Sequence, residues 1–496
     1  MSLLVLSGIT VNLVLYFVFN YSQRRGIGSD HYFHIKLIRR IKNNNHKFVK
    51  DYVINRNEEN PFYPQLFHWI LSYVNSKILN KNQSIIDIFI VFIEVIIFNY
   101  FVIRYFNFND IEVFQLNLAW ALFPFNYIGW NAKNKGISAR QFGLSIGRVF
   151  LVFLFIYINE SSVLNLSILI LIYIITTLSS QFSFQFINFF IIIISILYLN
   201  VFIFLIIPIS LCILFVYDFD YFNKYFTGQF YHKFNVYKYV SNFGILKNRK
   251  GIYKDFCFDF WKKLFNEKIT TSLNYIRHNP VVEVAYGFPL IFIIFYNYNY
   301  LSLNYNLELR FILIGFAIFF LTSFSFSRFL GEPQRYVEFL IPFISFLSIL
   351  VGSKYIFVIL ILSFSTILLN IIIDSKVSSS HTVNSLIVDL KKYFSNIDSD
   401  LIVTSNDAEL LKYITLENIE VLRNDPSKNY YNPTYDYYFV DDHASISEFS
   451  LVSLTNKWKP DYLIINKSIY DISHNLSFDK YKLSCNFKNI AIYSIS

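Results

Sequence analysis

The chain has 496 residues, of which 54% are hydrophobic, and several of its apolar runs are long enough to cross a bilayer, so we expect a polytopic membrane protein. Its three cysteines lie far apart and form no metal-binding or disulfide pattern, which excludes a disulfide-stapled secreted module. The net charge of +9 is uneven, because residues 374–496 carry 12 basic and 16 acidic side chains, a net of −4, which leaves +13 for the preceding part.

Eleven apolar runs have the length expected of membrane spans. The first has no small-residue cleavage site, so we interpret it as a retained span and not as a signal peptide. The apolar stretch Phe184–Val216 is too long for one untilted helix, and we divide it at Asn200. The expected spans are 2–20, 84–103, 112–130, 141–158, 163–179, 185–199, 201–217, 283–297, 310–327, 336–352 and 355–373.

With eleven spans, alternate connections lie on the same side of the membrane. The connections on one side are the long or polar ones: 21–83, 131–140, 180–184, 218–282, 328–335 and the tail from 374. The other side keeps short links only. This one-sidedness is typical of an enzyme with its site at one membrane surface and less so of an alternating-access carrier. The positive-inside tendency does not fix the orientation, because it weakens for connections longer than about 60 residues.

The two long connections supply the basic excess, with 11 basic and 4 acidic residues in 21–83, and 11 basic and 5 acidic in 218–282. Such segments suit a lipid-headgroup surface or a basin for a phosphorylated substrate. We expect amphipathic helices over His31–Ile41 and Leu66–Leu79, and an interfacial helix around Phe256–Ile269.

The tail has the patterning of a soluble domain. Its elements are expected to be helices at Ser385–Phe394 and Ala408–Tyr413 and strands at Leu401–Thr404, Ile419–Leu422, Asp461–Ile465 and, as a pair, within Tyr481–Ile495. We therefore predict a transmembrane catalytic domain over 1–373 and a small C-terminal α/β domain over 374–496.

Ionisable residues gather just after the first span, in Gly28-Ser29-Asp30-His31-Tyr32-Phe33-His34. Asp30, His31 and His34 can share one helix face and serve a general base or a divalent cation, and His68 follows in the same connection. Two other readings remain open: Asp30 caps the helix that starts at His31, and the histidines only belong to an aromatic-rich interface.

A second candidate site is the turn Ser327–Glu338, in which Gly331-Glu332-Pro333 precedes Gln334-Arg335. The turn would present Arg328, Glu332 and Arg335 toward the same surface as Asp30, and an arginine there can grip a phosphate with two hydrogen bonds. The alternative is that these charges only anchor helix ends.

A third candidate is the basic turn Lys133–Gln141, where Lys135 and Arg140 could hold a phosphate or could simply anchor a helix end. The sequence contains no Walker loop, Rossmann glycine fingerprint, zinc-protease helix or nucleophile elbow. The absence of these motifs from the sequence argues against ATP-driven transport and against a serine hydrolase.

Four features of the chain together resemble the GT-C superfamily of integral-membrane glycosyltransferases. They are the motif Asp30-His31-Tyr32-Phe33-His34 after the first span, the segment Tyr63-Pro64-Gln65-Leu66-Phe67-His68 that closes the connection, the many spans and the soluble tail. That superfamily includes the oligosaccharyltransferase catalytic subunit, the protein O-mannosyltransferases and the lipid A aminoarabinose transferase. The resemblance is best over the first hundred residues.

The resemblance implies inverting transfer of a hexosyl or pentosyl group from a polyprenyl-phosphate donor to a glycan, lipid or protein acceptor at the extracytoplasmic face of the cell membrane, in cell-envelope or polysaccharide biosynthesis. Asp30 resembles the family's first-loop acidic residue, which acts as general base or as ligand of a divalent cation such as Mg²⁺ or Mn²⁺. Residues 131–140 lack the second acidic residue that the family often has, and Glu332 is a substitute. Arg335 resembles the basic residue near the lipid phosphate.

Two other classes remain open. A polysaccharide polymerase or ligase would also use basic external loops and a lipid-diphosphate donor, with arginines in place of a first-loop carboxylate. A lipid-linked sugar flippase or carrier should bury ionisable residues at mid-membrane in paired repeats, whereas Glu94 is the only conspicuous mid-span acid and the sequence shows no repeat. We expect membrane lipids as partners and no nucleic acid.

Overall fold

The computed structural model forms two compact units. Unit 1 comprises Met1–Arg25, Asn75–Tyr217 and Gly251–Ser378, and unit 2 comprises Gly26–Val74, Asp218–Lys250 and Ser379–Ser496. The residues that the structure describes are 2–22, 29–50, 63–75, 79, 83–127, 137, 139–238, 280–324, 327, 330, 333–352, 357, 360–368, 389–390, 392–394, 401–405, 419–421, 437–440, 443–446, 459–466, 481–487 and 490–495.

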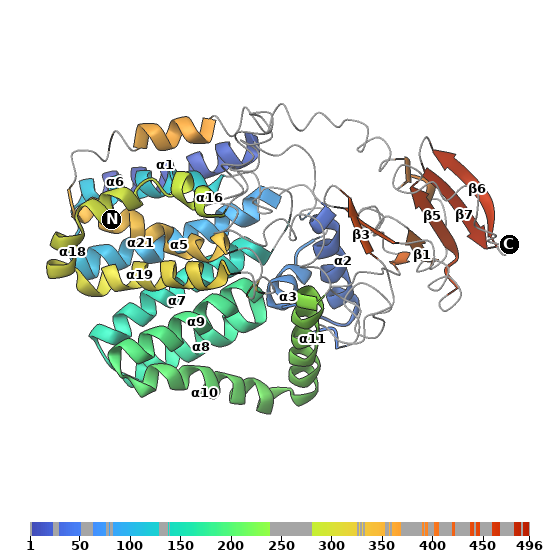
Figure 1. Ribbon diagram of the computed structural model, residues 1–496, viewed down its shortest axis with the longest axis horizontal. Coiled ribbons are helices and arrows are strands. Elements are labelled where there is room, and N and C mark those ends of the chain that lie inside the picture. The colour runs from blue at the N-terminus through green and yellow to red at the C-terminus, as the bar shows by residue number, and fades with distance from the viewer. Residues whose placement is uncertain are drawn as a thin grey trace. The chain divides into compact units, whose positions relative to one another are not determined.

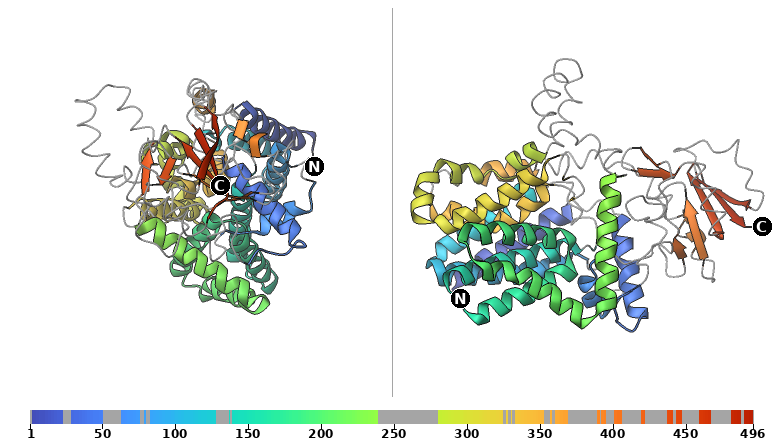
Figure 2. Two further views of the ribbon diagram at one scale, coloured as in Figure 1. Left: turned by 90° about the vertical axis from the view of Figure 1, so that its right-hand side faces the viewer. Right: turned by 60° about the horizontal axis from the view of Figure 1, so that its bottom comes forward.

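Unit 1 is a bundle of helices (Figure 1). The helices α7–α10 pack against one another and lie side by side in each view of Figures 1 and 2. The described helices of this unit are α1 (Leu3–Ser22), α5 (Gln83–Phe106), α6 (Asp110–Ala121), η1 (Pro124–Asn126), α7 (Ala139–Asn159), α8 (Val163–Ser179), α9 (Gln181–Tyr198), α10 (Val201–Tyr217), α16 (Pro280–Gly287), α17 (Ile291–Tyr296), α18 (Tyr298–Asn304), α19 (Asn306–Thr322), α20 (Gln334–Val337), η7 (Glu338–Leu340) and α21 (Ile341–Leu350).

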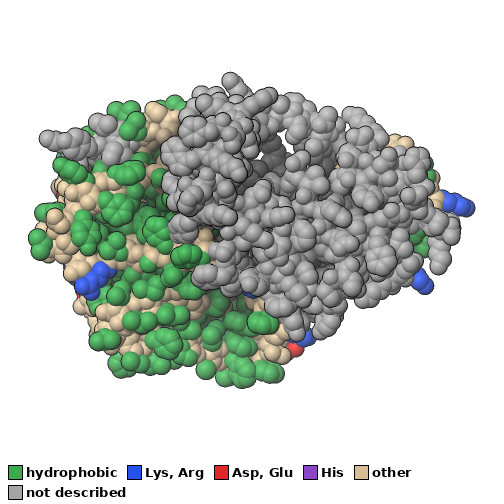
Figure 3. Space-filling view, in the orientation of Figure 1, with side chains coloured by type: hydrophobic (Ala, Val, Ile, Leu, Met, Phe, Trp, Pro, Cys, Tyr) green, Lys and Arg blue, Asp and Glu red, His purple; other side chains and the backbone are tan. Residues whose placement is uncertain are grey.

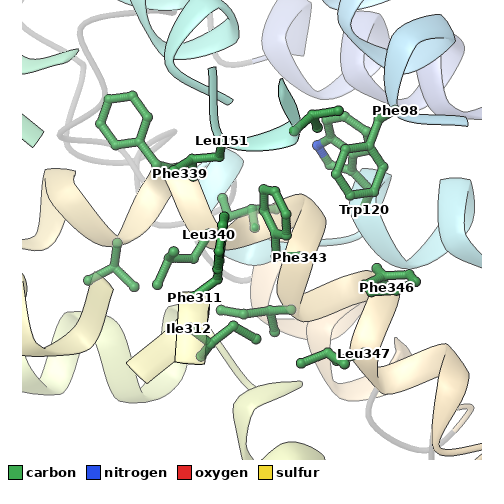
Figure 4. Packing of buried hydrophobic residues seen from close by; sticks show 14 of the residues in the cluster. Phe98, Trp120, Leu151, Phe311, Ile312, Phe339, Leu340, Phe343, Phe346 and Leu347 are labelled. Atoms are coloured by element: carbon green, nitrogen blue, oxygen red, sulfur yellow. The ribbon is translucent and has the colours of Figure 1, made fainter. Parts of the chain in front are cut away.

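Aromatic side chains fill the interior of unit 1. Phe98 of α5 meets Trp120 of α6 and Phe343 of α21 edge to face, with ring centroids 5.4 Å apart in both pairs (Figure 4). The exterior is apolar as well, with large side chains such as Leu164 and Phe202 exposed. Figure 3 shows hydrophobic side chains spread over one face of these helices. An apolar core inside an apolar surface is what a lipid-embedded bundle requires.

Among the described residues, three helices are long and apolar enough to cross a membrane, with the windows Ile85–Phe106, Ala139–Asn159 and Gln181–Tyr198. Shorter apolar helices occupy Leu3–Phe19, Val163–Ser179 and Val201–Tyr217. The expected membrane character is therefore confirmed, and the expected count of eleven spans is not.

The division at Asn200 is confirmed. Helix α9 ends at Tyr198, Leu199 takes the left-handed conformation (φ 48°) that closes a helix, and α10 begins at Val201. The Asn200 side chain accepts a hydrogen bond from the Phe202 amide at 3.0 Å, as a helix-starting residue does. One polar residue in a long apolar run thus marks the turn.

Three expected spans are interrupted by proline, which lacks an amide hydrogen and disfavours helical geometry in the residue before it. The run 112–130 contains Pro124 and yields only α6 and the short η1. The run 283–297 contains Pro289 and divides into α16 and α17. The run 336–352 contains Pro342 and divides into α20, η7 and α21.

Unit 2 contains the helices of the two long connections and the tail. Helix α2 (Ser29–Asn43) confirms the expected helix over His31–Ile41, and α3 (Leu66–Ser72) ends earlier than the expected Leu66–Leu79. Helix α11 (Phe219–Lys238) opens the second long connection. The interfacial helix expected around 256–269 and the tail helix expected at 408–413 lie outside the described residues.

The tail forms a five-stranded sheet with the order β2-β1-β5-β7-β6, in which β2, β1 and β5 are parallel and β7 is antiparallel to both β5 and β6. The strands are β1 (Leu401–Ser405), β2 (Ile419–Val421), β5 (Tyr462–Asn466), β6 (Tyr481–Phe487) and β7 (Ile490–Ile495), with a separate hairpin of β3 (Tyr437–Val440) and β4 (His443–Ile446). Phe394, in the expected helix, packs on one face of the sheet. The expected C-terminal strand region is confirmed, while the separate α/β domain over 374–496 remains a prediction.

Candidate functional site

The turn expected to grip a phosphate ends in α20, which carries Arg335 and Tyr336. The Arg335 guanidinium lies over the Phe182 ring of α9, with its carbon 4.8 Å from the ring centroid. The buried Tyr336 hydroxyl lies 2.8 Å from Gln185 Oε1 and 3.0 Å from the Leu330 carbonyl oxygen, so it ties α20 to α9 and to the preceding turn. These contacts orient the guanidinium plane.

Arg140 lies in the first turn of α7 and forms an ion pair with Glu338 of η7. The Glu338 side chain is 2% exposed and that of Arg140 is 16% exposed, so the pair lies at the edge of the protein interior. An anchoring or phosphate-binding role for Arg140 remains a prediction. The contact does join the basic turn before α7 to the segment that carries Arg335.

A second ion pair lies deeper in unit 1, in the middle of two membrane helices. Arg148 Nη1 of α7 donates to Glu94 Oε1 of α5 at 2.7 Å, and both side chains are almost completely buried. The other carboxylate oxygen of Glu94 accepts from the Ser145 hydroxyl. Arg148 also donates through Nε (3.2 Å) and Nη2 (2.7 Å) to the backbone carbonyl of Glu338. All three guanidinium nitrogens are therefore used.

Sequence reasoning singled out Glu94 and missed Arg148 and the role of Glu338. The signal was present, because Arg148 is a basic residue inside an expected span, and a charge in that environment needs a partner. Pairing the mid-span charges of two different spans would have predicted the contact.

In unit 2, helix α2 begins at Ser29, two residues before the expected start at His31. Asp30 is therefore in the first turn of the helix, and a capping role for it stays a prediction. The side chains of Asp30 and His31 lie outside the described part of the structure. By helical spacing His34 follows Asp30 by one turn on the same face.

His34 and His68, both predicted site residues, come together across α2 and α3. His34 Nδ1 and His68 Nε2 are 2.8 Å apart, the rings stack with centroids 5.0 Å apart, and the Tyr63 ring packs edge-on against both. Burial lowers the pKa of His68 well below 6.5, and the neighbouring His34 lowers it further. His68 is consequently neutral at physiological pH.

The position of α3 is fixed by the Gln65 side chain, which forms two hydrogen bonds with the Val49 backbone, as a neighbouring strand would. Gln65 accepts a hydrogen bond from the Val49 amide (2.8 Å) and donates one to the Val49 carbonyl (2.9 Å). The Trp69 indole donates to the His46 carbonyl at 2.8 Å. Three hydrogen bonds thus dock the segment after α2 on α3, which sets the distance between the two histidines.

The remaining predicted residues, Arg328 and Glu332, lie outside the described residues. Asp30 and Arg335 belong to different units, so their juxtaposition stays a prediction. Among the side chains that the structure does describe, no group of three His, Cys, Asp or Glu residues could hold a metal ion. The described residues therefore do not supply a cation site by themselves.

No family model and no curated protein matches the sequence. The structure is nevertheless similar to that of ArnT from Cupriavidus metallidurans bound to undecaprenyl phosphate, with a TM-score of 0.55 at 11% sequence identity over 99% of this chain and 97% of that one. The apo structure of the same protein has a TM-score of 0.52 at 11% identity over the same shares. The chain has the GT-C fold. This fold and the apolar helices make it an integral membrane protein. The GT-C fold extends over nearly the whole chain, beyond the first hundred residues where the sequence resemblance was best.

Proposed function

We propose that this protein is a membrane glycosyltransferase that transfers a sugar from a polyprenyl-phosphate carrier to a glycan, lipid or protein acceptor. The observation that carries the proposal is the GT-C fold, which matches a transferase of known structure over almost the full length of both chains. That relative was solved with undecaprenyl phosphate bound, which supports a polyprenyl-phosphate donor here. An inverting mechanism and an extracytoplasmic site belong to the same proposal.

The donor phosphate would be held by arginines. Arg335 is suited to this role because stacking on Phe182 orients the planar guanidinium, which can then donate two parallel hydrogen bonds to phosphate oxygens. Arg140 and Arg328 would add positive charge at the same surface. Their effect would be to stabilise the negative charge that builds up on the leaving phosphate.

Asp30 would act as the general base. Its carboxylate removes the proton from the acceptor hydroxyl while the hydroxyl oxygen attacks the anomeric carbon from the face opposite the leaving group. The bond between the anomeric carbon and the phosphate oxygen breaks, and its electron pair stays on the lipid phosphate. Asp30 would then release the proton to water, while His34, one helical turn from Asp30, would with its partner His68 hold the acceptor near that carboxylate. His31 would line the acceptor side.

A divalent cation, Mg²⁺ or Mn²⁺, stays part of the proposal only as an alternative role for Asp30, with Glu332 as a second ligand. When bound, such a cation would neutralise phosphate charge. The described side chains offer no complete ligand set, so the proposed mechanism contains no step through a metal.

The proposal is tested by release of lipid phosphate. Purified full-length protein in liposomes is incubated with polyprenyl-phosphate sugars and a mixture of glycan, lipid and peptide acceptors, and free polyprenyl phosphate is measured by mass spectrometry. Wild type should release it, and Asp30→Asn should not, while both keep the same thermal midpoint. Asp110→Asn is the matched control, because Asp110 also lies in the first turn of a helix and is exposed. Near-normal release by Asp30→Asn would rule out the general-base role.

One observation favours a second candidate. A lipid-linked sugar carrier should bury ionisable residues at mid-membrane, and the Glu94–Arg148 pair is such a feature. A carrier would move the intact lipid-linked sugar across the liposome membrane without releasing lipid phosphate. The same incubation therefore separates the two functions.

A further inference from the structure

The buried Arg148 lies against the 3-10 turn that separates helices α20 and α21. The chain runs from α20 through the 3-10 turn η7 into α21, and the break is at Glu338–Leu340. In a continuous α-helix the Glu338 carbonyl would accept the amide of residue 342, but Pro342 has none. The carbonyl instead accepts the Ile341 amide and two bonds from Arg148. Arg148 thus replaces the hydrogen bond that Pro342 removes.

The break lies at the depth of the helix interiors. A Cβ added at Gly147, in the middle of α7, would come within 2.4 Å of the Phe339 ring, and one added at Gly315, in the middle of α19, within 2.4 Å of Leu340. The Glu338 carbonyl keeps one hydrogen bond from the Ile341 amide, and because lipid cannot supply a further donor at this depth, Arg148 supplies it. A bare guanidinium would itself be costly there, and Glu94 compensates its charge.

We propose that Arg148, held by Glu94, is a positioning residue that fixes the break at Glu338–Leu340 and thereby places Arg335 for the donor phosphate. The inference rests on the proposed function, because it assigns Arg335 to that phosphate. Arg335 is three residues before Glu338, so the geometry of the break sets its direction. If the three residues of η7 became α-helical, Arg335 would turn by about 60° and shift by about 1.5 Å relative to α21.

The test uses a variant without the charged pair, Glu94→Gln with Arg148→Met. Replacing both charges avoids leaving one of them buried alone, so the protein should still fold. Binding of undecaprenyl phosphate to the full-length protein is measured by native mass spectrometry, and hydrogen exchange is measured over residues 334–341. We expect faster exchange in this segment and binding weakened roughly 10- to 100-fold, the fold-change for the loss of a hydrogen bond between Arg335 and a charged phosphate.

Arg310→Gln is the matched control. Arg310 is also an arginine of a membrane helix over an aromatic ring, with its guanidinium carbon 5.3 Å from the Tyr198 centroid, and it should leave exchange and binding unchanged. Adding Pro342→Ala to the paired variant supplies an amide for the Glu338 carbonyl. It should slow the exchange again but should not restore binding, because the helix then continues without the break.

Unchanged exchange in the paired variant would overturn the inference, and so would faster exchange with normal binding. Recovery of binding with Pro342→Ala would show that the carbonyl only needs a donor, which also overturns it. If wild type itself fails to bind undecaprenyl phosphate while the exchange responds as expected, the proposed function fails and not the role of Arg148 in the break.

Discussion

A close contact between α7 and the start of α9 gives a quantitative prediction for Gly143→Ala. The new Cβ on α7 would lie 2.1 Å from the Ser180 Cβ and 2.8 Å from the Ser183 hydroxyl oxygen. Carbon atoms in contact are about 3.5–4.0 Å apart, so α7 and the start of α9 would have to separate by roughly 1.5 Å. Ser180 cannot rotate away, because its Cβ is attached directly to the backbone that begins α9.

The expected cost follows from two opposing effects. Overpacking costs about 1–3 kcal/mol, and the upper end applies because backbone must move. Alanine regains about 1 kcal/mol of helix propensity over glycine. Gly143→Ala should therefore lower the free energy of unfolding by about 2 kcal/mol, measured by titration with sodium dodecyl sulfate.

Removal of the opposing atom should reverse this loss. Ser180→Gly alone should cost only a few tenths of a kcal/mol, since glycine is a tolerated N-cap. Combined with Gly143→Ala it should return the unfolding free energy to within about 0.5 kcal/mol of wild type. A neutral Gly143→Ala, or a double variant as unstable as the single one, would refute the packing argument.

Three further predictions concern the polar sites. Because burial lowers the pKa of His68 below 6.5, only the unfolded chain takes up this proton as the pH falls through 6.5, so stability should decrease there. His68→Gln should flatten that dependence of the thermal midpoint; an unaltered slope would contradict it. Arg335→Lys keeps the charge but loses the planar stacking on Phe182, so undecaprenyl phosphate binding should weaken about 10-fold, and equal binding would contradict the assignment. The Asp218 side chain caps the start of α11 and pairs with Lys50 at 2.8 Å. Asp218→Ala should therefore lower the local stability of α11 by about 1 kcal/mol, measured by hydrogen exchange. Asp218→Asn keeps the cap and should cost less.

Asp218 also makes the stability depend on pH, but through hydrogen bonds to its charged form, whereas His68 acts through burial. Burial raises the pKa of Asp218, but hydrogen bonds from Lys50 and from the Tyr221 amide outweigh burial and lower it overall. The carboxylate thus stabilises the fold above the unfolded pKa of 3.8, and that contribution is lost as the pH falls through the lower folded value. Between pH 7 and 5, the loss of stability should therefore come from His68 and not from Asp218.

Local chemistry determined the parts of the fold that could be predicted from the sequence. Hydropathy located the apolar helices α1, α5 and α7–α10, Asn200 divided the apolar run at the right residue, and the patterning of the tail predicted β1, β2, β5, β6 and β7 but not the hairpin of β3 and β4. These features depend on neighbours in the chain, because a helix end or a strand is selected by the residues that form it. The wording around Asp30 and His68 was enough to suggest the GT-C superfamily, and the fold agrees.

Only the tertiary structure decided how distant residues meet. The sequence could not show that Arg148 donates to the Glu338 carbonyl, which Pro342 deprives of its helical partner, since Arg148 and Glu338 are far apart in the chain. Nor could it show that His34 and His68 share a hydrogen bond, because their distance depends on how Gln65 docks α3. Side-chain type and local spacing fix which groups need partners. Packing of the helices decides which partners they receive, because in lipid every buried polar group must be satisfied from within the protein.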